Sequence, residues 1–343
     1  MDRLTITRPD DFHLHLRDGQ AMASVLEDTA RRFGRAIVMP NLAPPVRTTQ
    51  QALHYRDRIL GELPQGSSFE PLMTLYLTDD TPPEEISRAK LSGRVHGVKL
   101  YPAGATTHSD AGVTRISRCF VTLEKMEQLG LPLLIHGEVT DPMVDVFDRE
   151  KAFVDEVLGP IVERFSSLKV VLEHLTTRDA VQYVEITGPN VAATITPQHL
   201  LLNRNALFLG GIRPHHYCLP VLKREEHREA VVAAAISGNP KFFLGSDSAP
   251  HSRASKEAGC GCAGVYSAHA AIELYATAFE EADALDKLEA FASHFGADFY
   301  GLPRNKDSIT LVRREWTVPQ TLRFGGEQLV PLRAGETIPW KLA

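Results

Sequence analysis

Five side chains with the chemistry of metal ligands stand inside or directly after short apolar runs. They are His13 and His15 in DFHLHL, His136 in LPLLIHG, His174 in KVVLEHL and Asp247 in KFFLGSD. Side chains two apart on a strand face the same side, so the imidazoles of His13 and His15 can reach one metal ion. An HxH pair alone also fits two hydrogen-bonded histidines. The whole set, at equivalent places in different runs, favours a metal site of imidazole and carboxylate ligands.

Lys99 is the unexpected member of this group, because it lies inside the apolar run GVKLYP. A lysine there either extends its amine to the rim of the fold or is chemically modified. An ammonium would be repelled by two neighbouring divalent cations. Carbamylation by CO2 makes the side chain negative and supplies one oxygen for each metal. We therefore predict N6-carboxylysine at Lys99, bridging a binuclear site.

Eight short apolar runs must position these residues. They are DFHLHL (11–16), RAIVMP (35–40), LMTLYL (72–77), GVKLYP (97–102), LPLLIHG (131–137), KVVLEHL (169–175), VAATITP (191–197) and KFFLGSD (241–247). Near-continuous apolar runs are typical of parallel strands buried on both faces. Helical patterns fill several gaps, at 116–126, 148–165 and 222–237, with Pro160 expected to kink the second.

Strands alternating with helices predict an α/β fold, a TIM-type (β/α)8 barrel. The alternative is an open doubly wound sheet, which would carry GxGxxG after its first strand if it bound a dinucleotide, where this chain has HLHLRDG. We predict one domain over 1–343, with about 40 residues from Gly301 as a tail packed on the barrel. Catalytic groups of barrels lie at the C-terminal ends of strands, where Lys99, Asn41 and the five ligand candidates fall.

Composition excludes several other classes of protein. Hydrophobic residues make up 43% and charged residues 23%, and the net charge is −6, so no basic excess would attract nucleic acid or an anionic membrane. No apolar run approaches the ~20 residues of a membrane span, and the N-terminus has no secretory pattern. The four cysteines form no CxxC pair, and Cys260 and Cys262 are expected to shape a Gly-rich loop. We expect a cytoplasmic protein.

Eight motifs carry a family resemblance over nearly the whole chain. They are HLHLRD (13–18), MPNLAPP (39–45), KLYPAGATT (99–107), HGEVT (136–140), EHLTT (173–177), ITPQHL (195–200), GGIRPHHYCLP (210–220) and GSDSAPH (245–251). The sequence resembles the amidohydrolase superfamily and is more similar still to the dihydroorotase family of the class II bacterial type.

This resemblance implies two Zn²⁺ ions per subunit and a role for each matching residue. One zinc would be bound by His13, His15, Lys99 and Asp247, and the other by Lys99, His136 and His174. Substrate contacts would come from His15, Arg17, Asn41, Thr106, Thr107, His136, Leu219, His251 and Ala263, with Leu219 and Ala263 using backbone groups. Thr106 and Thr107 would lie in a loop that closes over the substrate. Gly104, His108 and Asp110 depart from the family pattern around that loop.

The implied activity is the reversible cyclisation of N-carbamoyl-L-aspartate to L-dihydroorotate plus water in pyrimidine biosynthesis. A hydroxide bridging the zincs would attack the ring amide, and Asp247 would act as acid and base. The family also implies a homodimer. Two alternatives stay open: another cyclic-amide hydrolase, such as a hydantoinase or dihydropyrimidinase, and a catalytically inactive barrel that serves as an assembly partner.

Overall fold

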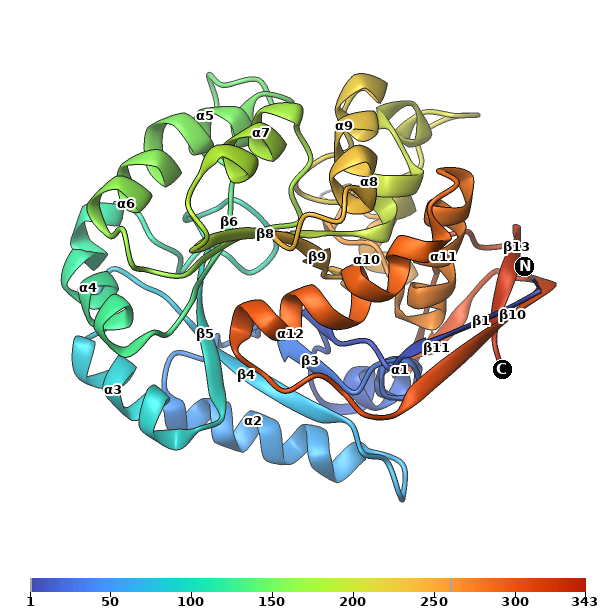
Figure 1. The fold of residues 1–343 in the computed structure, drawn as a ribbon, viewed down its shortest axis with the longest axis horizontal. Helices are drawn as coiled ribbons and strands as arrows, with labels where there is room; N and C mark the ends of the chain where they lie inside the picture. The colour runs from blue at the N-terminus through green and yellow to red at the C-terminus, as the bar shows by residue number, and fades with distance from the viewer. Residues whose placement is uncertain (1, 260) are drawn as a thin grey trace.

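Eight parallel strands form a nearly closed barrel in the computed structural model, which describes residues 2–259 and 261–343. Helices surround these strands (Figure 1). The barrel strands, in spatial and chain order, are β2 (Asp11–Leu14), β3 (Arg35–Val38), β4 (Glu70–Tyr76), β5 (Val95–Leu100), β6 (Leu133–His136), β7 (Val170–Glu173), β8 (Val191–Ile195) and β9 (Phe242–Leu244). Each strand lies within or overlaps one of the eight apolar runs, so the prediction of a (β/α)8 barrel is confirmed.

The first and last barrel strands meet through the residues that follow β9. The backbone N–H of Asp247 donates to the carbonyl of His13 at 2.9 Å, and that of His15 donates to Ser248 at 3.1 Å. The buried carboxylate of Asp11 accepts from the N–H groups of both His13 and Ser246. This closure therefore places His13, His15 and Asp247 at one seam.

Twelve α-helices are found in the described residues. They are α1 (Gly19–Arg32), α2 (Thr49–Glu62), α3 (Pro83–Ser92), α4 (Phe120–Leu129), α5 (Arg149–Phe153), α6 (Gly159–Arg164), α7 (Arg178–Ile186), α8 (Pro197–Leu201), α9 (Glu225–Ile236), α10 (Arg253–Lys256), α11 (Ala271–Glu281) and α12 (Phe295–Tyr300). A π-helical turn at Val154–Leu158 joins α5 to α6. Because Pro160 has no N–H to donate, the interruption predicted there takes the form of a widened turn.

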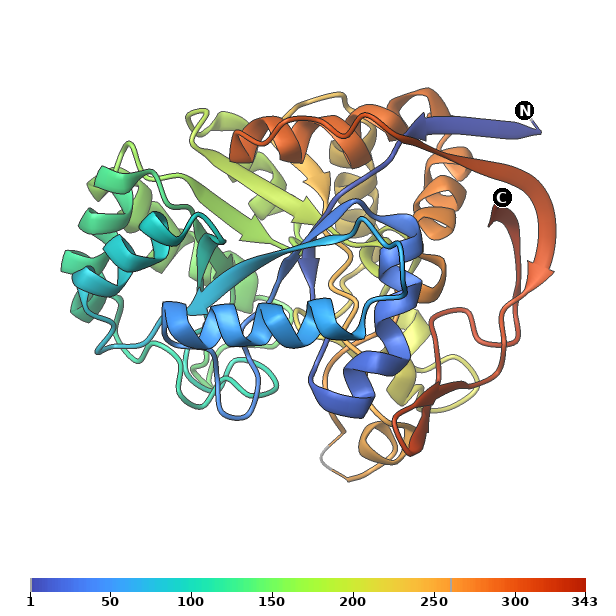
Figure 2. The same ribbon diagram turned by 90° about the horizontal axis from the view of Figure 1, so that it is seen from below.

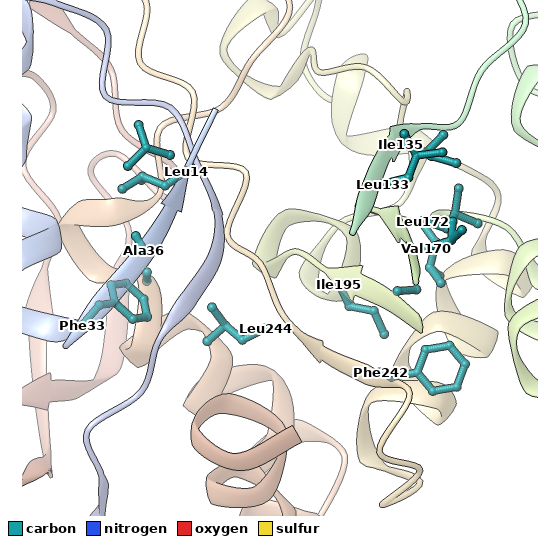
Figure 3. Close-up of a cluster of buried hydrophobic side chains, with 14 of the residues drawn as sticks. Leu14, Phe33, Ala36, Leu133, Ile135, Val170, Leu172, Ile195, Phe242 and Leu244 are labelled. Atoms are coloured by element: carbon teal, nitrogen blue, oxygen red, sulfur yellow. The ribbon is translucent and has the colours of Figure 1, made fainter. Parts of the chain in front are cut away.

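Alternating side chains of the strands divide the core into two layers. Leu133 and Ile135 of β6 point outward toward the helices, with Val170 and Leu172 of β7 beside them (Figure 3). The intervening Leu134 belongs instead to the inner cluster, together with Val171, Phe12, Ile37 and Phe243. In β5, Val98 and Leu100 pack in the outer layer, which leaves Lys99 between them to face the interior. Lys99 is fully buried.

The inner cluster is covered by α12, which lies against β9. The ring of Tyr300 stacks on that of Phe12 with centroids 5.0 Å apart. Gly296 permits this approach, because a Cβ there would lie 2.2 Å from the Phe12 ring. This aromatic packing fills the interior beneath the polar end of the barrel.

The remaining strands form two smaller sheets. In the first, β10 (Ser308–Thr317) pairs antiparallel with both β1 (Arg3–Thr7) and β13 (Thr337–Leu342). The second is a hairpin of β11 (Leu322–Phe324) and β12 (Glu327–Leu329). Figure 2 shows the two ends of the chain together at one side of the barrel. The pairing of β1 with β10 was not predicted from the sequence. No helix in the described part of the chain has both the length and the apolarity to cross a membrane.

Candidate metal and substrate site

A cavity lies at the C-terminal ends of the barrel strands. Eleven of the predicted site residues line it: His13, His15, Arg17, Asn41, Thr106, Thr107, His136, His174, Leu219, Asp247 and Ala263. Lys99 lies buried beneath this cavity, and His251 lies beside it in contact with Arg17. A larger outer cavity shares Arg17 and Asn41 with it.

Three potential ligand atoms converge where the barrel closes. Nε2 of His13 and Nε2 of His15 lie 3.2 Å apart, and Oδ1 of Asp247 lies 3.2 Å from the first and 3.1 Å from the second. Ligands at tetrahedral zinc, with bonds of ~2.0–2.1 Å, are separated by about 3.3 Å. The spacing therefore matches a metal coordination shell, and the two imidazoles point toward one common position.

The tautomer of His15 supports the same interpretation. Nδ1 of His15 lies 2.9 Å from Oδ1 of Asn41, and an amide oxygen can only accept. Burial lowers the pKa of His15 to about 4, so the ring is neutral, with its proton on Nδ1. The Nε2 lone pair then faces the Asp247 carboxylate, an arrangement that a cation between them would stabilise.

Glu173 links Lys99 to His13 below these ligands. Its Oε2 accepts from Nζ of Lys99, and its Oε1 lies 3.2 Å from Nδ1 of His13 without hydrogen-bond geometry. Burial lowers the pKa of His13, but the charges of Glu173 and Asp247 outweigh it and raise that pKa to about 9. Burial likewise lowers the pKa of the Lys99 amine. Carboxylates that draw a proton onto a buried imidazole would equally favour a metal cation.

The second predicted metal position is less complete. His174 lies beside His13, with ring centroids 5.0 Å apart, and its ligand atom groups with those of His13 and Glu173. Nδ1 of His174 has no hydrogen-bond partner, and burial lowers its pKa well below the usual value. Nε2 of His136 instead lies 2.8 Å from Oε2 of Glu138. The residues present thus fit a metal at the first position, and His174 offers a free donor for another.

Backbone strain accompanies three of the site residues. Arg17, His174 and Asp247 have φ angles of 64°, 45° and 44°, in the left-handed region that non-glycine residues seldom adopt. Each such residue costs ~1–3 kcal/mol, so the surrounding packing must hold it. Arg17 lines the pocket although β2 ends at Leu14, because the left-handed turn at Arg17 directs its side chain there.

Arg17 and His251 form the polar end of the cavity. Nε of Arg17 donates to the carbonyl of Pro250, and its Nη2 lies 2.9 Å from Nε2 of His251. Burial and the charge of Arg17 lower the pKa of His251 to about 2, so this ring is neutral and accepts that bond. The guanidinium is held at one edge, and its planar fork suits a carboxylate.

The loop carrying Thr106 and Thr107 lies over the cavity. Oγ1 of Thr107 donates to the carbonyl of Ala263, and its own carbonyl accepts from Nδ2 of Asn41. His108 has a φ of 56°, and its Nδ1 lies 3.4 Å from the Asn41 carbonyl. The loop therefore contacts Asn41 and Ala263, two residues that are expected to bind the substrate.

Three residues of the site were not singled out from the sequence. Glu173 and Glu138 are buried carboxylates that contact His13 and His136, and Tyr101 lines the cavity with an unpartnered hydroxyl. A usable signal existed, because Glu173 directly precedes His174 and Glu138 follows His136 by two positions. Carboxylates beside ligand histidines commonly orient them. Of the cysteine pair, Cys260 lies outside the described residues, and Cys262 is a half-buried free thiol.

Comparison with known proteins adds to this geometry. The chain is 67% identical over 344 residues to a dihydroorotase of Nitrosomonas europaea, covering 100% of this chain and 99% of the relative. A dihydroorotase structure from Campylobacter jejuni has a TM-score of 0.90 at 36% identity, covering 99% of this chain and 97% of its own. The Saccharomyces cerevisiae dihydroorotase, solved with 5-fluoroorotic acid, has a TM-score of 0.92 at 33% identity, covering 100% and 99%. No family model matches the chain.

Proposed function

Since the chain belongs to the dihydroorotase family, we propose that it catalyses the reversible cyclisation of N-carbamoyl-L-aspartate to L-dihydroorotate plus water. The observation that carries this proposal is the cavity itself. It joins a cluster of imidazole and carboxylate ligands to a guanidinium at the opposite edge, as a cyclic amide with a ring carboxylate requires. A hydantoin or dihydrouracil ring lacks the carboxylate that Arg17 would bind.

Two zinc ions would be held by the residues at the seam and the neighbouring strands. His13, His15 and Asp247 would hold one ion, His136 and His174 the other, and a carbamylated Lys99 both. When bound, the ions supply Lewis acidity and lower the pKa of a water molecule. Lys99 contacts the Glu173 carboxylate, so carbamylation would set two negative charges side by side. The modification would therefore depend on nearby cations, and metal removal should release it.

The other residues would bind and orient the substrate. Arg17, Asn41 and His251 would hold its carboxylate, while backbone groups of Leu219 and Ala263 contact the ring. The Thr106–Thr107 loop would exclude water during turnover. In the hydrolytic direction Asp247 would take a proton from the attacking water and deliver it to the departing amide nitrogen, and in cyclisation it would receive the ureido proton.

The proposal is tested by assaying the purified protein with L-dihydroorotate and dihydrouracil while measuring its zinc content. We expect turnover of dihydroorotate, little of dihydrouracil, and about two zinc ions per chain. Absence of dihydroorotate turnover in the zinc-loaded protein would refute it, and preference for dihydrouracil would favour a hydantoinase-like activity. Sedimentation of the same sample tests the expected homodimer.

A further inference from the structure

Lys256 is a buried lysine that the proposed mechanism does not use. It ends α10, and only 4% of its surface is exposed. Its Nζ donates to three backbone carbonyls, those of Tyr217 at 2.7 Å, Cys262 at 2.8 Å and Gly264 at 2.7 Å. No carboxylate of the described residues lies within ion-pairing distance of it. All three N–H donors of the ammonium are thus used by backbone acceptors.

These three carbonyls belong to the two segments that form one wall of the cavity. Tyr217 precedes Leu219 by two residues, and Cys262 and Gly264 flank Ala263. Both Leu219 and Ala263 line the cavity. The Tyr217 carbonyl also accepts from the N–H of Gly264 at 3.0 Å, so the two segments meet where the ammonium sits.

The charged form of Lys256 is needed for this arrangement. A neutral amine has only two N–H donors and would turn a lone pair toward one of the carbonyls. Burial lowers the pKa of Lys256 to about 8, with the nearby charge of Arg17 adding to this and the thiols of Cys218 and Cys262 opposing it. Leaving a cation buried costs several kcal/mol unless it is well bonded, so a packing role alone would be filled better by an apolar side chain.

We propose that Lys256 is a positioning residue, which holds the backbones around Leu219 and Ala263 at the spacing that grips the substrate ring. This inference rests on the proposed function, because the ring is that of dihydroorotate. Lys256 also supports the closed loop, since Ala263 provides the carbonyl that Thr107 contacts. These backbone groups would bind the ring equally in the ground state and the transition state. Loss of their spacing should therefore raise KM more than it lowers kcat.

The test compares Lys256→Met with Lys241→Met. Lys241 also donates to three backbone carbonyls, those of Val184, Glu185 and Thr187, but it lies before β9, at the opposite end of the barrel. Both substitutions remove an ammonium that caps backbone carbonyls. We expect Lys256→Met to raise the KM for dihydroorotate about tenfold with kcat changed much less, whereas Lys241→Met lowers thermal stability and leaves KM unchanged.

Amide hydrogen exchange over residues 215–220 and 257–266 gives a readout independent of turnover. Exchange there should accelerate in Lys256→Met but not in Lys241→Met. If Lys256→Met is insoluble, Lys256→Arg replaces it, because a planar guanidinium cannot reach three converging carbonyls from one point. Equal KM values in the two methionine variants, or unchanged exchange, would overturn the proposal. A wild-type protein that fails to turn over dihydroorotate would instead refute the proposed function, while the exchange data still decide whether Lys256 holds the two segments.

Discussion

Among single residues, Asp247 should have the largest effect on catalysis. Its Oδ1 contacts Nε2 of both His13 and His15, and it would carry the proton to and from the reacting amide. Asp247→Asn keeps the volume and tolerates the left-handed backbone, but it removes the basic oxygen. We expect kcat to fall about 10²- to 10⁴-fold. Steady-state hydrolysis of dihydroorotate checks this, with the exposed Asp298→Asn as control, and near-normal kcat in Asp247→Asn would contradict it.

Glu173 would not contact the substrate, but its carboxylate should strengthen metal binding at the site. Glu173→Gln removes the charge facing His13 and Lys99 while keeping the shape. We expect metal affinity or activity to fall about 10- to 100-fold. Elemental analysis after dialysis against a weak chelator gives the measurement. Glu150→Gln is a matched control, because Glu150 is equally buried but bonds only Thr176 and Thr177. Equal metal retention by both variants would show that Glu173 has no such role.

His199 should make folding stability depend on pH. Burial lowers its pKa to about 4, and its ring nitrogens contact Thr196 and the Pro220 carbonyl. Below pH 6.5 the unfolded chain binds a proton that the folded ring resists, so stability falls between pH 6.5 and 4, by about 3 kcal/mol. Denaturant titrations at several pH values in this range give the free energy of unfolding. That free energy should depend less steeply on pH in His199→Gln than in wild type. The exposed His54→Gln is the control, and identical slopes in His199→Gln and wild type would contradict the assignment.

Some residues of the site could be predicted from the sequence and others could not. Spacing within apolar runs sufficed to bring His13, His15 and Asp247 together, because strand geometry fixes where such side chains point. Glu173 directly precedes His174, which was a local signal, but its contacts with Lys99 and His13 join different strands and could not be predicted from spacing. The positive φ of Asp247 could not be foreseen, since only the barrel closure imposes it.

At the scale of elements, the loop through Gly264 sets the shape of the substrate wall. Gly264 has a φ of 144°, and a Cβ there would lie 2.9 Å from Ala249 and from the His251 ring. Gly264→Ala should therefore cost about 1–3 kcal/mol of stability and displace His251, raising KM. Gly188→Ala is the control, because a Cβ at that position would have no neighbouring atom within 4 Å. Thermal unfolding and steady-state kinetics measure the two effects. If Gly264→Ala matches Gly188→Ala in both stability and KM, Gly264 does not set the shape of the substrate wall.

The barrel strands themselves were predictable because each lies in or overlaps a near-continuous apolar run, as expected of strands buried on both faces. Their ends were not, since polar residues such as His174 and Asp247 lie beyond the strand pairing. The π-helical turn before Pro160 also escaped, because proline indicates an interruption without fixing its form. Pairing of β1 with β10 joins residues about 300 positions apart, and neither strand alone specifies its partner.

At the scale of the whole molecule, the C-terminal strands should unfold with the barrel. Trp340 of β13 is fully buried in the outer core, and its indole N–H donates to Glu280 at the end of α11. Trp340→Ala should destabilise the protein by about 3–5 kcal/mol and lower the temperature of one cooperative transition. Calorimetry measures this, with the exposed Leu91→Ala as control. An early separate transition, with the main one unchanged, would show instead that the tail folds apart from the barrel and that the chain is not a single domain.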